Sequence, residues 1–317
     1  MYRLIHVPLD GSPFAELALP LAVSLAKRDG AALQIVRVYE PIEGQYLHRP
    51  GTYASELDRE LMDNARDELK ATATTLADKT GFGADFVLIK GSVSEMLARH
   101  ASASNADLLV MTTQARGPLG RLWFGSVADA LVRLAPIPIL LVRPTENAPD
   151  FAPQPLIRRV LIPLDGSRLA EEALEPALSL CGADGDFTLL RVIPAVTPVA
   201  YEPTTGRMSG LRSSALQQLQ ELKRRQEAEA NEYLEETAKR LRSRSLNVQT
   251  QLATYEQPAV AILEAAARHS VDAIAMTTRG RSGIKRMLLG SVADKVIRGA
   301  NNPILICPTV SETREPR

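Results

Sequence analysis

The chain carries the same long pattern twice. The segment VPLDGS at Val7–Ser12 returns as IPLDGS at Ile162–Ser167, and the segment Met111–Arg133 returns as Met276–Arg298 with the shared letters GSVAD near its end. The first pair lies 155 residues apart and the second 165, so the copies align with about ten extra residues inside the second. Solenoid and propeller repeats have periods of roughly 20 to 50 residues, so a unit of this length is a whole domain. The chain is therefore expected to hold two similar cores, and any site can exist twice.

The length of 317 residues agrees with two domains of about 100 to 200 residues each. We place the first domain, copy one, at residues 1–144 and the second, copy two, at residues 157–309. Residues 145–156 form a proline-rich segment with too little apolar material for a core, which predicts a semi-rigid linker. Residues 310–317 are a tail.

In each copy, short apolar runs typical of strands alternate with segments of helical periodicity. The expected strands are Leu4–Leu9, Leu33–Tyr39, Ala84–Lys90, Asp107–Thr112 and Ile139–Arg143, then Arg159–Leu164, Phe187–Ile193, Val248–Thr254, Ala273–Thr277 and Ile304–Cys307. The expected helices are Ala15–Lys27, Glu56–Lys79, Val93–Ala103 and Val127–Leu134, then Ala170–Cys181, Ser213–Arg244, Ala259–His269 and Val292–Arg298. This alternation implies right-handed crossovers and a parallel sheet covered on both faces. The predicted fold class is α/β, with two tandem doubly wound five-stranded parallel-sheet domains of about 150 residues each.

The long helix expected at Ser213–Arg244 carries interleaved charges four residues apart. The pairs are Glu221 with Arg225, Glu235 with Lys239, and Glu236 with Arg240. Such spacing favours a solvated, ion-paired face, and a partner-binding helix is the alternative.

The overall composition excludes several classes of protein. Thirty-seven basic and 37 acidic residues cancel, which removes the electrostatic footprint of a nucleic-acid binder. Cys181 and Cys307 have no counterpart in the other copy, which favours free thiols in a reducing compartment over a disulfide. The N-terminus lacks a basic region followed by a long apolar run, and no stretch reaches about 18 apolar residues. We therefore expect a cytoplasmic protein with no membrane partner.

The strongest candidate for a site lies at strand ends in copy two. Residues 277–283 (TTRGRSG) leave a buried strand, and Gly290 and Ser291 open a helix. Glycines let backbone N–H groups turn toward an anion, and a helix N-terminus adds donors and a favourable dipole. This pattern predicts a phosphate cradle. Asp165 would stand across the crevice to accept hydrogen bonds from a ribose hydroxyl or an adenine amino group, while the strand carrying Val192 would offer main-chain hydrogen bonds to the base.

Purely structural explanations fit the same residues. Ser291 with Asp294 three residues later resembles a capping box, and Asp165-Gly166-Ser167 can be only a turn and a helix cap. The residues alone leave nucleotide binding and structural capping both open.

With these motifs, the chain resembles the universal stress protein family, specifically its tandem-domain members. The ATP-binding subgroup carries glycine, two residues, glycine, nine residues, then glycine and serine or threonine, together with an aspartate at the end of strand one. Gly280, the nine following residues, Gly290 and Ser291 match this motif, Asp165 matches the aspartate, and Thr277 replaces the first glycine. The resemblance covers nearly the whole chain. It implies a Rossmann-like domain of the adenine nucleotide alpha hydrolase type, in which two domains pair through their last strands.

The resemblance further implies a stress-response protein that acts as a nucleotide-dependent sensor or interaction module. The implied cofactor is ATP, with or without Mg²⁺, and a homodimer is a possible assembly. The implied binding residues in copy two are Asp165, Val192, Thr277, Gly280, Arg281, Gly283, Gly290, Ser291 and Val292. The second-ranked set, in copy one, is Asp10, Val38, Thr112, Gly125, Ser126 and Val127. Copy one has Ala115 and Pro118 where copy two has Gly280 and Gly283, so binding is expected mainly in the C-terminal domain.

The sequence leaves enzymatic activity open, and at most slow ATP hydrolysis is expected. A GxxxxGK[ST] loop and a dinucleotide fingerprint after strand one are both missing, and the four histidines fit surface or core roles better than catalysis. No metal site is predicted. The alternatives to a binding module are an adenine-nucleotide hydrolase or nucleotidyl transferase on the same fold, and a scaffold that binds no nucleotide.

Overall fold

The computed structural model describes residues 1–41, 52–113, 125–143, 151, 154–195, 209–278 and 289–309. Residues 52–55 and 209–216 are described by their backbone alone.

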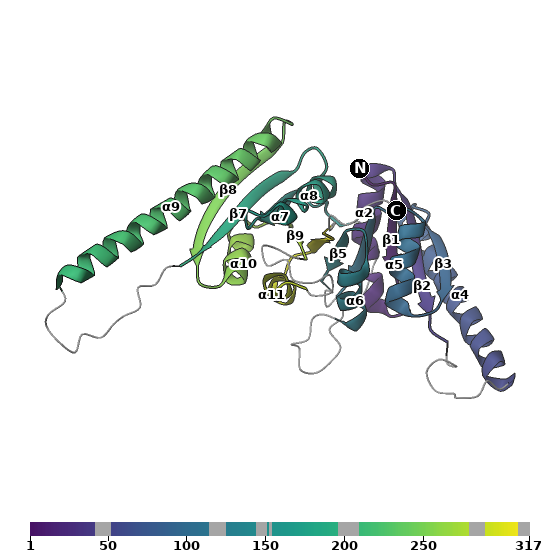
Figure 1. Ribbon diagram of the computed structural model, residues 1–317. Coiled ribbons are helices and arrows are strands. Elements are labelled where there is room, and N and C mark those ends of the chain that lie inside the picture. The colour runs from purple at the N-terminus through teal and green to yellow at the C-terminus, as the bar shows by residue number, and fades with distance from the viewer. Residues whose placement is uncertain are drawn as a thin grey trace, which may run out of the picture.

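Each copy forms a five-stranded parallel sheet of the predicted kind (Figure 1). The strands of copy one are β1 (Leu4–Pro8), β2 (Ala32–Tyr39), β3 (Asp85–Lys90), β4 (Leu108–Thr112) and β5 (Ile139–Val142). The strands of copy two are β6 (Arg159–Pro163), β7 (Asp186–Pro194), β8 (Asn247–Tyr255), β9 (Ala273–Thr277) and β10 (Ile304–Cys307). Copy one has the order β3-β2-β1-β4-β5, and copy two repeats it as β8-β7-β6-β9-β10. The strand order therefore reverses beside β1 in one copy and beside β6 in the other, where open α/β sheets bind ligands.

Helices cover both faces of the sheet. The helices of copy one are α1 (Pro13–Glu16), α2 (Leu19–Asp29), α4 (Thr52–Thr80), α5 (Val93–Ala103) and α6 (Ser126–Leu134). Those of copy two are α7 (Arg168–Glu171), α8 (Leu174–Cys181), α9 (Ser209–Arg242), α10 (Pro258–Arg268) and α11 (Ser291–Gly299). Buried residues of α2, α4, α8 and α9 form one core layer, and those of α5, α6, α10 and α11 form the other. Successive strand residues divide between the layers, as Ile35 and Val36 do, because side chains alternate across a strand.

The first helix of each copy is interrupted, contrary to the continuous helices expected at Ala15–Lys27 and Ala170–Cys181. In copy one α1 ends at Glu16 and α2 begins at Leu19. Pro20 has no N–H and cannot donate to the carbonyl four residues earlier. Between the two helices, backbone N–H groups instead donate to carbonyls three residues earlier, as in a 3₁₀ turn. Pro176 has the same effect between α7 and α8.

The two sheets join edge to edge through their last strands, as the family resemblance implied. Strands β5 and β10 run antiparallel, with Ile304 opposite Leu141, Leu305 opposite Leu140, and Ile306 opposite Ile139. All residues of both strands are buried. The result is one ten-stranded sheet in which neither last strand is left as an exposed edge.

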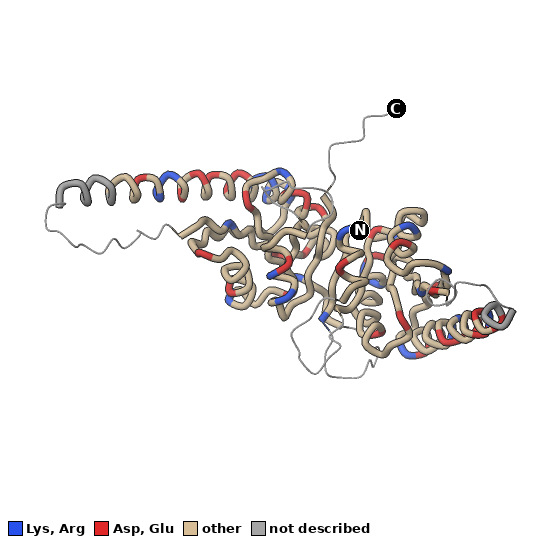
Figure 2. Tube along the Cα trace, turned by 60° about the horizontal axis from the view of Figure 1, so that its bottom comes forward, with Lys and Arg blue, Asp and Glu red and all other residues tan. Residues whose placement is uncertain are grey.

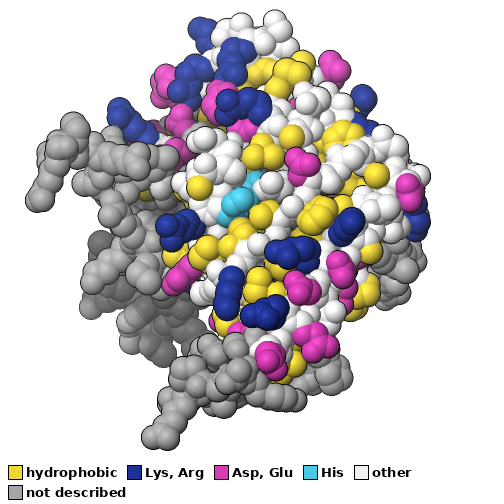
Figure 3. Space-filling model, turned by 90° about the vertical axis from the view of Figure 1, so that its right-hand side faces the viewer, with side chains coloured by type: hydrophobic (Ala, Val, Ile, Leu, Met, Phe, Trp, Pro, Cys, Tyr) yellow, Lys and Arg dark blue, Asp and Glu magenta, His cyan; other side chains and the backbone are white. Residues whose placement is uncertain are grey.

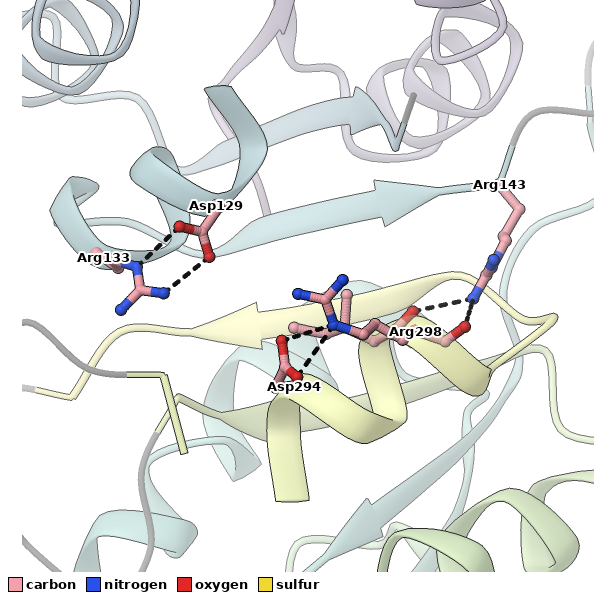
Figure 4. A network of polar contacts seen from close by, with 6 residues as sticks. Asp129, Arg133, Arg143, Asp294 and Arg298 are labelled. Carbon is pink, nitrogen blue, oxygen red and sulfur yellow. Dashed lines mark hydrogen bonds and ion pairs between the residues drawn. The ribbon is translucent and has the colours of Figure 1, made fainter. Parts of the chain in front are cut away.

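Two arginines of copy one reach the C-terminal ends of copy-two helices. Arg143 donates from Nη2 to the carbonyls of Ile297 at 2.9 Å and Arg298 at 3.3 Å, at the end of α11 (Figure 4). Arg28 donates to the carbonyl of Ser179 at 2.8 Å near the end of α8. Cations at helix C-termini are favoured by the orphan carbonyls and the helix dipole, so these contacts reinforce the joint between the copies.

Both cysteines are free, as expected from the sequence, and the fold buries both of them. Burial raises the pKa of the Cys181 thiol to about 12 and also raises that of Cys307.

The long helices α4 and α9 extend beyond the sheet at opposite ends of the molecule, and acidic and basic residues alternate along them (Figures 1 and 2). The expected pair between Glu221 and Arg225 is present at 3.1 Å. Glu235 instead contacts Arg242 at 2.9 Å, and Arg240 contacts Glu171 on α7. The C-terminal half of α9 packs on the domain, so its charges meet partners outside the four-residue spacing.

The surface does not separate into basic and acidic halves on the face drawn in Figure 3, where both kinds of charge lie among hydrophobic side chains. Among the described residues, none of the helices has the length and apolar content that a bilayer crossing needs.

Candidate functional site

A pocket of about 300 Å³ opens in copy two at the carboxyl ends of β6, β7 and β9. This volume is at the lower end of the range for small-molecule sites, roughly 300 to 1,000 Å³. Six of the nine residues expected in copy two line it: Asp165, Val192, Thr277, Gly290, Ser291 and Val292. The other three, Gly280, Arg281 and Gly283, fall within residues 279–288, outside the described part of the chain. The tertiary structure therefore brings together residues from four separate segments of copy two.

Asp165 lies in the turn that follows β6 and faces this pocket. Its Oδ1 accepts hydrogen bonds from the Ser167 N–H at 2.9 Å and from the Ser167 hydroxyl at 2.6 Å. The Ser167 Oγ in turn accepts from the Ala170 N–H at 3.2 Å and caps α7. The turn-and-cap explanation of this motif is thus correct as local structure. The same bonds fix the orientation of a carboxylate that lines the pocket.

Gly166 is required by the shape of this turn. Its φ is +85°, a region that residues with a side chain rarely adopt, and a Cβ there would lie 2.7 Å from Nη1 of Arg191. Gly11 has φ +83° and the same relation to Arg37 in copy one. The repeated Asp-Gly-Ser turn therefore depends on close packing of an arginine against the glycine.

The N-terminus of α11 forms the opposite wall. Gly290 is the N-cap in an extended conformation, with φ −64° and ψ 145°, and its N–H donates to the Thr278 carbonyl at 2.9 Å. The first bond inside the helix runs from the Asp294 N–H to the Gly290 carbonyl at 2.9 Å. The N–H groups of Ser291, Val292 and Ala293 precede that bond and lie at the pocket. They are the donors that an anion would meet, and the helix dipole favours negative charge there.

The capping-box interpretation of Ser291 and Asp294 is wrong. The cap position belongs to Gly290, which has no side chain, and no side-chain hydrogen bond caps the helix. Ser291 is already inside the first turn, and Asp294 pairs with Arg298 at 3.0 Å (Figure 4). No side-chain oxygen at the cap position competes with a ligand for the first amides of α11.

The third wall is apolar and carries the main chain of Val192. The Leu164 N–H bonds to the Leu190 carbonyl at 2.7 Å just after β6 ends at Pro163, while β7 continues to Pro194. Backbone groups alternate in direction along a strand, so Val192 faces the same side as Leu190, where β6 no longer pairs with it. Ile262 and Met276 contribute further apolar surface. This wall can take a flat heterocycle and offer it main-chain hydrogen bonds.

Copy one repeats the framework with its second-ranked residues. Asp10 Oδ1 accepts from the Ser12 N–H at 2.9 Å and from its hydroxyl at 2.5 Å. Gly125 is the extended N-cap of α6, which begins at Ser126. The remaining members hold matching places: Thr112 ends β4, Val127 follows Ser126 in α6, and Val38 lies in β2. Ala115 and Pro118, the substitutions expected to weaken phosphate binding here, lie outside the described residues.

An arginine that was not among the expected site residues lies behind each turn. Arg191 packs against Gly166, and its guanidinium carbon lies 5.0 Å from the centre of the Tyr233 ring on α9. The Tyr233 hydroxyl donates to Glu171 Oε1 at 3.0 Å. The available signal was a charged residue inside a short apolar run of each copy, namely Arg37 in IVRV and Arg191 in LLRVI.

Catalytic groups are scarce around the pocket. Asp165 is the only carboxylate among its described lining residues. No cluster of three or more His, Cys, Asp or Glu side chains suited to a metal ion occurs in the described parts of the chain. These surroundings offer recognition groups for an anionic, hydroxyl-bearing ligand, with backbone donors at the N-terminus of α11 and one carboxylate, Asp165, across the pocket.

Comparison with known proteins gives consistent matches over both copies. The universal stress protein family model matches residues 1–143 and again residues 156–308. A universal stress protein from Thermus aquaticus is 34% identical over 143 residues, which are 45% of this chain and 100% of that protein.

Solved structures match the arrangement of the whole chain. The crystal structure of a universal stress protein from Archaeoglobus fulgidus covers 96% of this chain and is itself covered to 96%, with a TM-score of 0.64 at 17% identity. A structure from Pseudomonas aeruginosa UCBPP-PA14 covers 97% of this chain, is covered to 94%, and has a TM-score of 0.56 at 18% identity. At such identities the structural likeness concerns the fold alone.

Proposed function

The chain belongs to the universal stress protein family, and on that premise we propose that copy two binds an adenine nucleotide, ATP. With ATP bound, the protein works as a nucleotide-dependent sensor or interaction module in the stress response. One observation carries the proposal. A carboxylate, the main chain of Val192 and the first amides of α11 line a single pocket at the strand-order reversal of copy two. These three kinds of group match the sugar, base and phosphate parts of a nucleotide.

The walls suggest how the ligand would lie. The adenine would rest on the apolar wall and bond to the main chain of Val192, and the ribose would approach Asp165. The phosphates would extend toward the N-terminus of α11 at Ser291 and Val292. Mg²⁺ fits only as an ion carried by the phosphates, because Asp165 is the sole acid among the described lining residues.

Asp165 is suited to holding a ligand hydroxyl. Its Oδ1 accepts two hydrogen bonds from Ser167, which fix the orientation of the carboxylate at the pocket. A binding role with a regulatory outcome therefore accounts for the described site without a catalytic step.

The test compares two variants with two ligands by calorimetry. Valine readily adopts the extended backbone angles of Gly290, so Gly290→Val should fold. Its branched side chain would stand at the N-terminus of α11, where the phosphates are proposed to bind. It should lose most of the advantage of ATP over adenosine, since only ATP reaches α11. Asp165→Ala should weaken both ligands alike by about ten- to a hundredfold, the effect of one hydrogen bond to a charged group.

The matched controls are the same changes in copy one, Gly125→Val and Asp10→Ala. They should leave the stronger site intact if binding belongs mainly to copy two. A folded Gly290→Val protein that binds ATP as tightly as the parent would refute the phosphate assignment. Equal losses from the copy-one changes would refute the assignment to copy two.

A further inference from the structure

Copy two uses one of its own tyrosines to fill a space behind the Asp-Gly-Ser turn. The ring of Tyr233 lies by the Arg191 guanidinium, and its hydroxyl donates to Glu171 at 3.0 Å. Burial raises the pKa of the Tyr233 phenol, and the Glu171 carboxylate raises it further. A neutral phenol is therefore held between a cation beside its ring and an acceptor at its hydroxyl.

Copy one keeps the residues that hold this phenol but not the phenol itself. Arg37 corresponds to Arg191 because both pack against the turn glycine, and Glu16 corresponds to Glu171 because each is the last residue of its first short helix. Helices α4 and α9 align through four buried pairs: Ala65 with Ala230, Leu69 with Leu234, Ala73 with Ala238, and Leu76 with Leu241. This register places Glu68 where copy two has Tyr233.

A cavity is present at this place in copy one. It has a volume of about 240 Å³ and is lined by Leu9, Gly11, Glu16, Arg37, Glu68, Leu69, Ala71 and Thr72. A protein cavity of about 150 Å³ is large enough to bind benzene, so this one can hold a single substituted ring. Arg37 and Val38 are successive strand residues, so their side chains point to opposite faces of the sheet. The cavity beside Arg37 therefore lies on the face opposite to Val38, which belongs to the copy-one counterpart of the copy-two pocket.

Two carboxylates of the cavity, those of Glu68 and Glu16, differ in their surroundings. Glu68 Oε2 accepts from Arg37 Nη1 at 2.6 Å at the outer side, where the Glu68 side chain is 63% exposed. Glu16 Oε1 accepts a long hydrogen bond of 3.3 Å from the Thr72 hydroxyl. Glu16 is half-buried, and this burial raises the pKa of its carboxyl. A ligand hydroxyl that donates to Glu16 would replace lost solvation.

We propose that this copy-one cavity binds a small neutral phenol, with the aromatic ring against Arg37 and Leu69 and the hydroxyl donating to Glu16. Tyr233 in copy two is the internal template for this geometry. The site is independent of the nucleotide pocket and does not rest on the function proposed above.

The test uses p-cresol, the side chain of tyrosine as a free molecule, and toluene, which lacks the hydroxyl. Amide chemical shifts of the full chain report where each probe binds. In the parent, p-cresol should move the signals of Gly11, Glu16 and Thr72 with a dissociation constant on the order of 1 mM, as expected for so small a ligand. Toluene should bind at least about tenfold more weakly, because it cannot donate to the carboxylate.

Two variants change the number of sites in opposite directions. Glu68→Tyr should fill the cavity with the chain's own phenol and abolish the shifts in copy one. Tyr233→Ala should open the equivalent space in copy two, add shifts at Gly166 and Thr237, and let p-cresol raise the lowered melting temperature. The expected numbers of phenol sites are one in the parent, none in Glu68→Tyr and two in Tyr233→Ala.

Three results would overturn the proposal. One is a parent without shifts in copy one up to the solubility limit of p-cresol, and another is a folded Glu68→Tyr protein with unchanged affinity. If Glu68→Tyr does not fold, Glu16→Ala tests the same contact: we expect p-cresol binding about tenfold weaker with toluene unaffected. Unchanged p-cresol binding by Glu16→Ala is the third overturning result.

Discussion

Replacing Arg143 with methionine should loosen the joint between the two copies. The change keeps most of the apolar stem of the side chain and removes the guanidinium that donates to the Ile297 and Arg298 carbonyls at 2.9 and 3.3 Å (Figure 4). A hydrogen bond from a charged group contributes about 1.5 to 3 kcal/mol, and a cation at a helix C-terminus adds about 0.3 to 1 kcal/mol. Burial lowers the pKa of Arg143, so the variant also recovers part of a desolvation cost. The net loss should be about 1 to 2 kcal/mol.

This loss should appear in copy two, although the altered residue belongs to copy one. A loss of 1 kcal/mol lowers the melting temperature of a domain of about 150 residues by about 2 to 4 °C, so we expect a decrease of about 2 to 8 °C by scanning calorimetry. Hydrogen exchange should accelerate in the last turn of α11, which Arg143 caps. The two copies should also unfold at more widely separated temperatures, because one of the bonds that couple them is gone.

Arg225→Met is the matched control, since it removes an exposed arginine paired with Glu221 on the surface of α9. Exposed pairs contribute about 0 to 1 kcal/mol, so this variant should melt close to the parent. An Arg143→Met protein that melts no lower than Arg225→Met would contradict the stabilising role of these hydrogen bonds. A loss of stability confined to copy one would contradict it as well.

Three further measurements test the structure locally. His6 is buried beside His100, and burial lowers the pKa of His6 from its usual 6.5 to about 4. Because the unfolded chain therefore takes up a proton more readily than the folded chain, the free energy of unfolding should fall by on the order of 2 kcal/mol between pH 6.5 and 4. In urea titrations, His6→Leu should remove that part of the pH dependence. Gly166→Ala should lower the stability of the folded protein more than Gly30→Ala does. Both glycines have positive φ, but only at Gly166 would a Cβ lie 2.7 Å from a guanidinium nitrogen. Equal losses of stability would show that this crowding is unimportant. The buried Cys307 thiol, with its raised pKa, should react with a thiol reagent only as fast as the chain opens, and rapid labelling of the folded protein would contradict this placement.

Much of the fold was accessible from local sequence patterns. Strand and helix periodicity predicted the order of elements, and the duplicated motifs predicted that the order would occur twice. The Asp-Gly-Ser turn was predictable because a glycine flanked by Asp and Ser supplies both the left-handed residue and the side-chain acceptors that a turn and a cap need. The interacting groups within a strand, a helix or this turn are a few residues apart, so their spacing along the chain carries the information.

Other features depended on groups that only the folded chain brings together. The four-residue spacing predicted an ion pair between Arg240 and Glu236, but in the folded chain Arg240 forms an ion pair with Glu171 on α7. The apolar last strands could be read from the sequence, whereas their antiparallel register depends on how the two sheets twist and meet, and the residues alone do not specify it.

The candidate site shows the same division. The sequence by itself determined its chemical inventory, namely a carboxylate after β6, a glycine at the start of α11 and a glycine-bearing segment between β9 and α11. The tertiary structure decided that Asp165, Val192 and Gly290 line one pocket, that Gly290 rather than Ser291 is the cap, and that Arg191 supports the turn from behind. The physical reason is distance: backbone periodicity and turn chemistry act between neighbours in sequence, while a pocket is defined by side chains that become neighbours only after the sheet has set their positions.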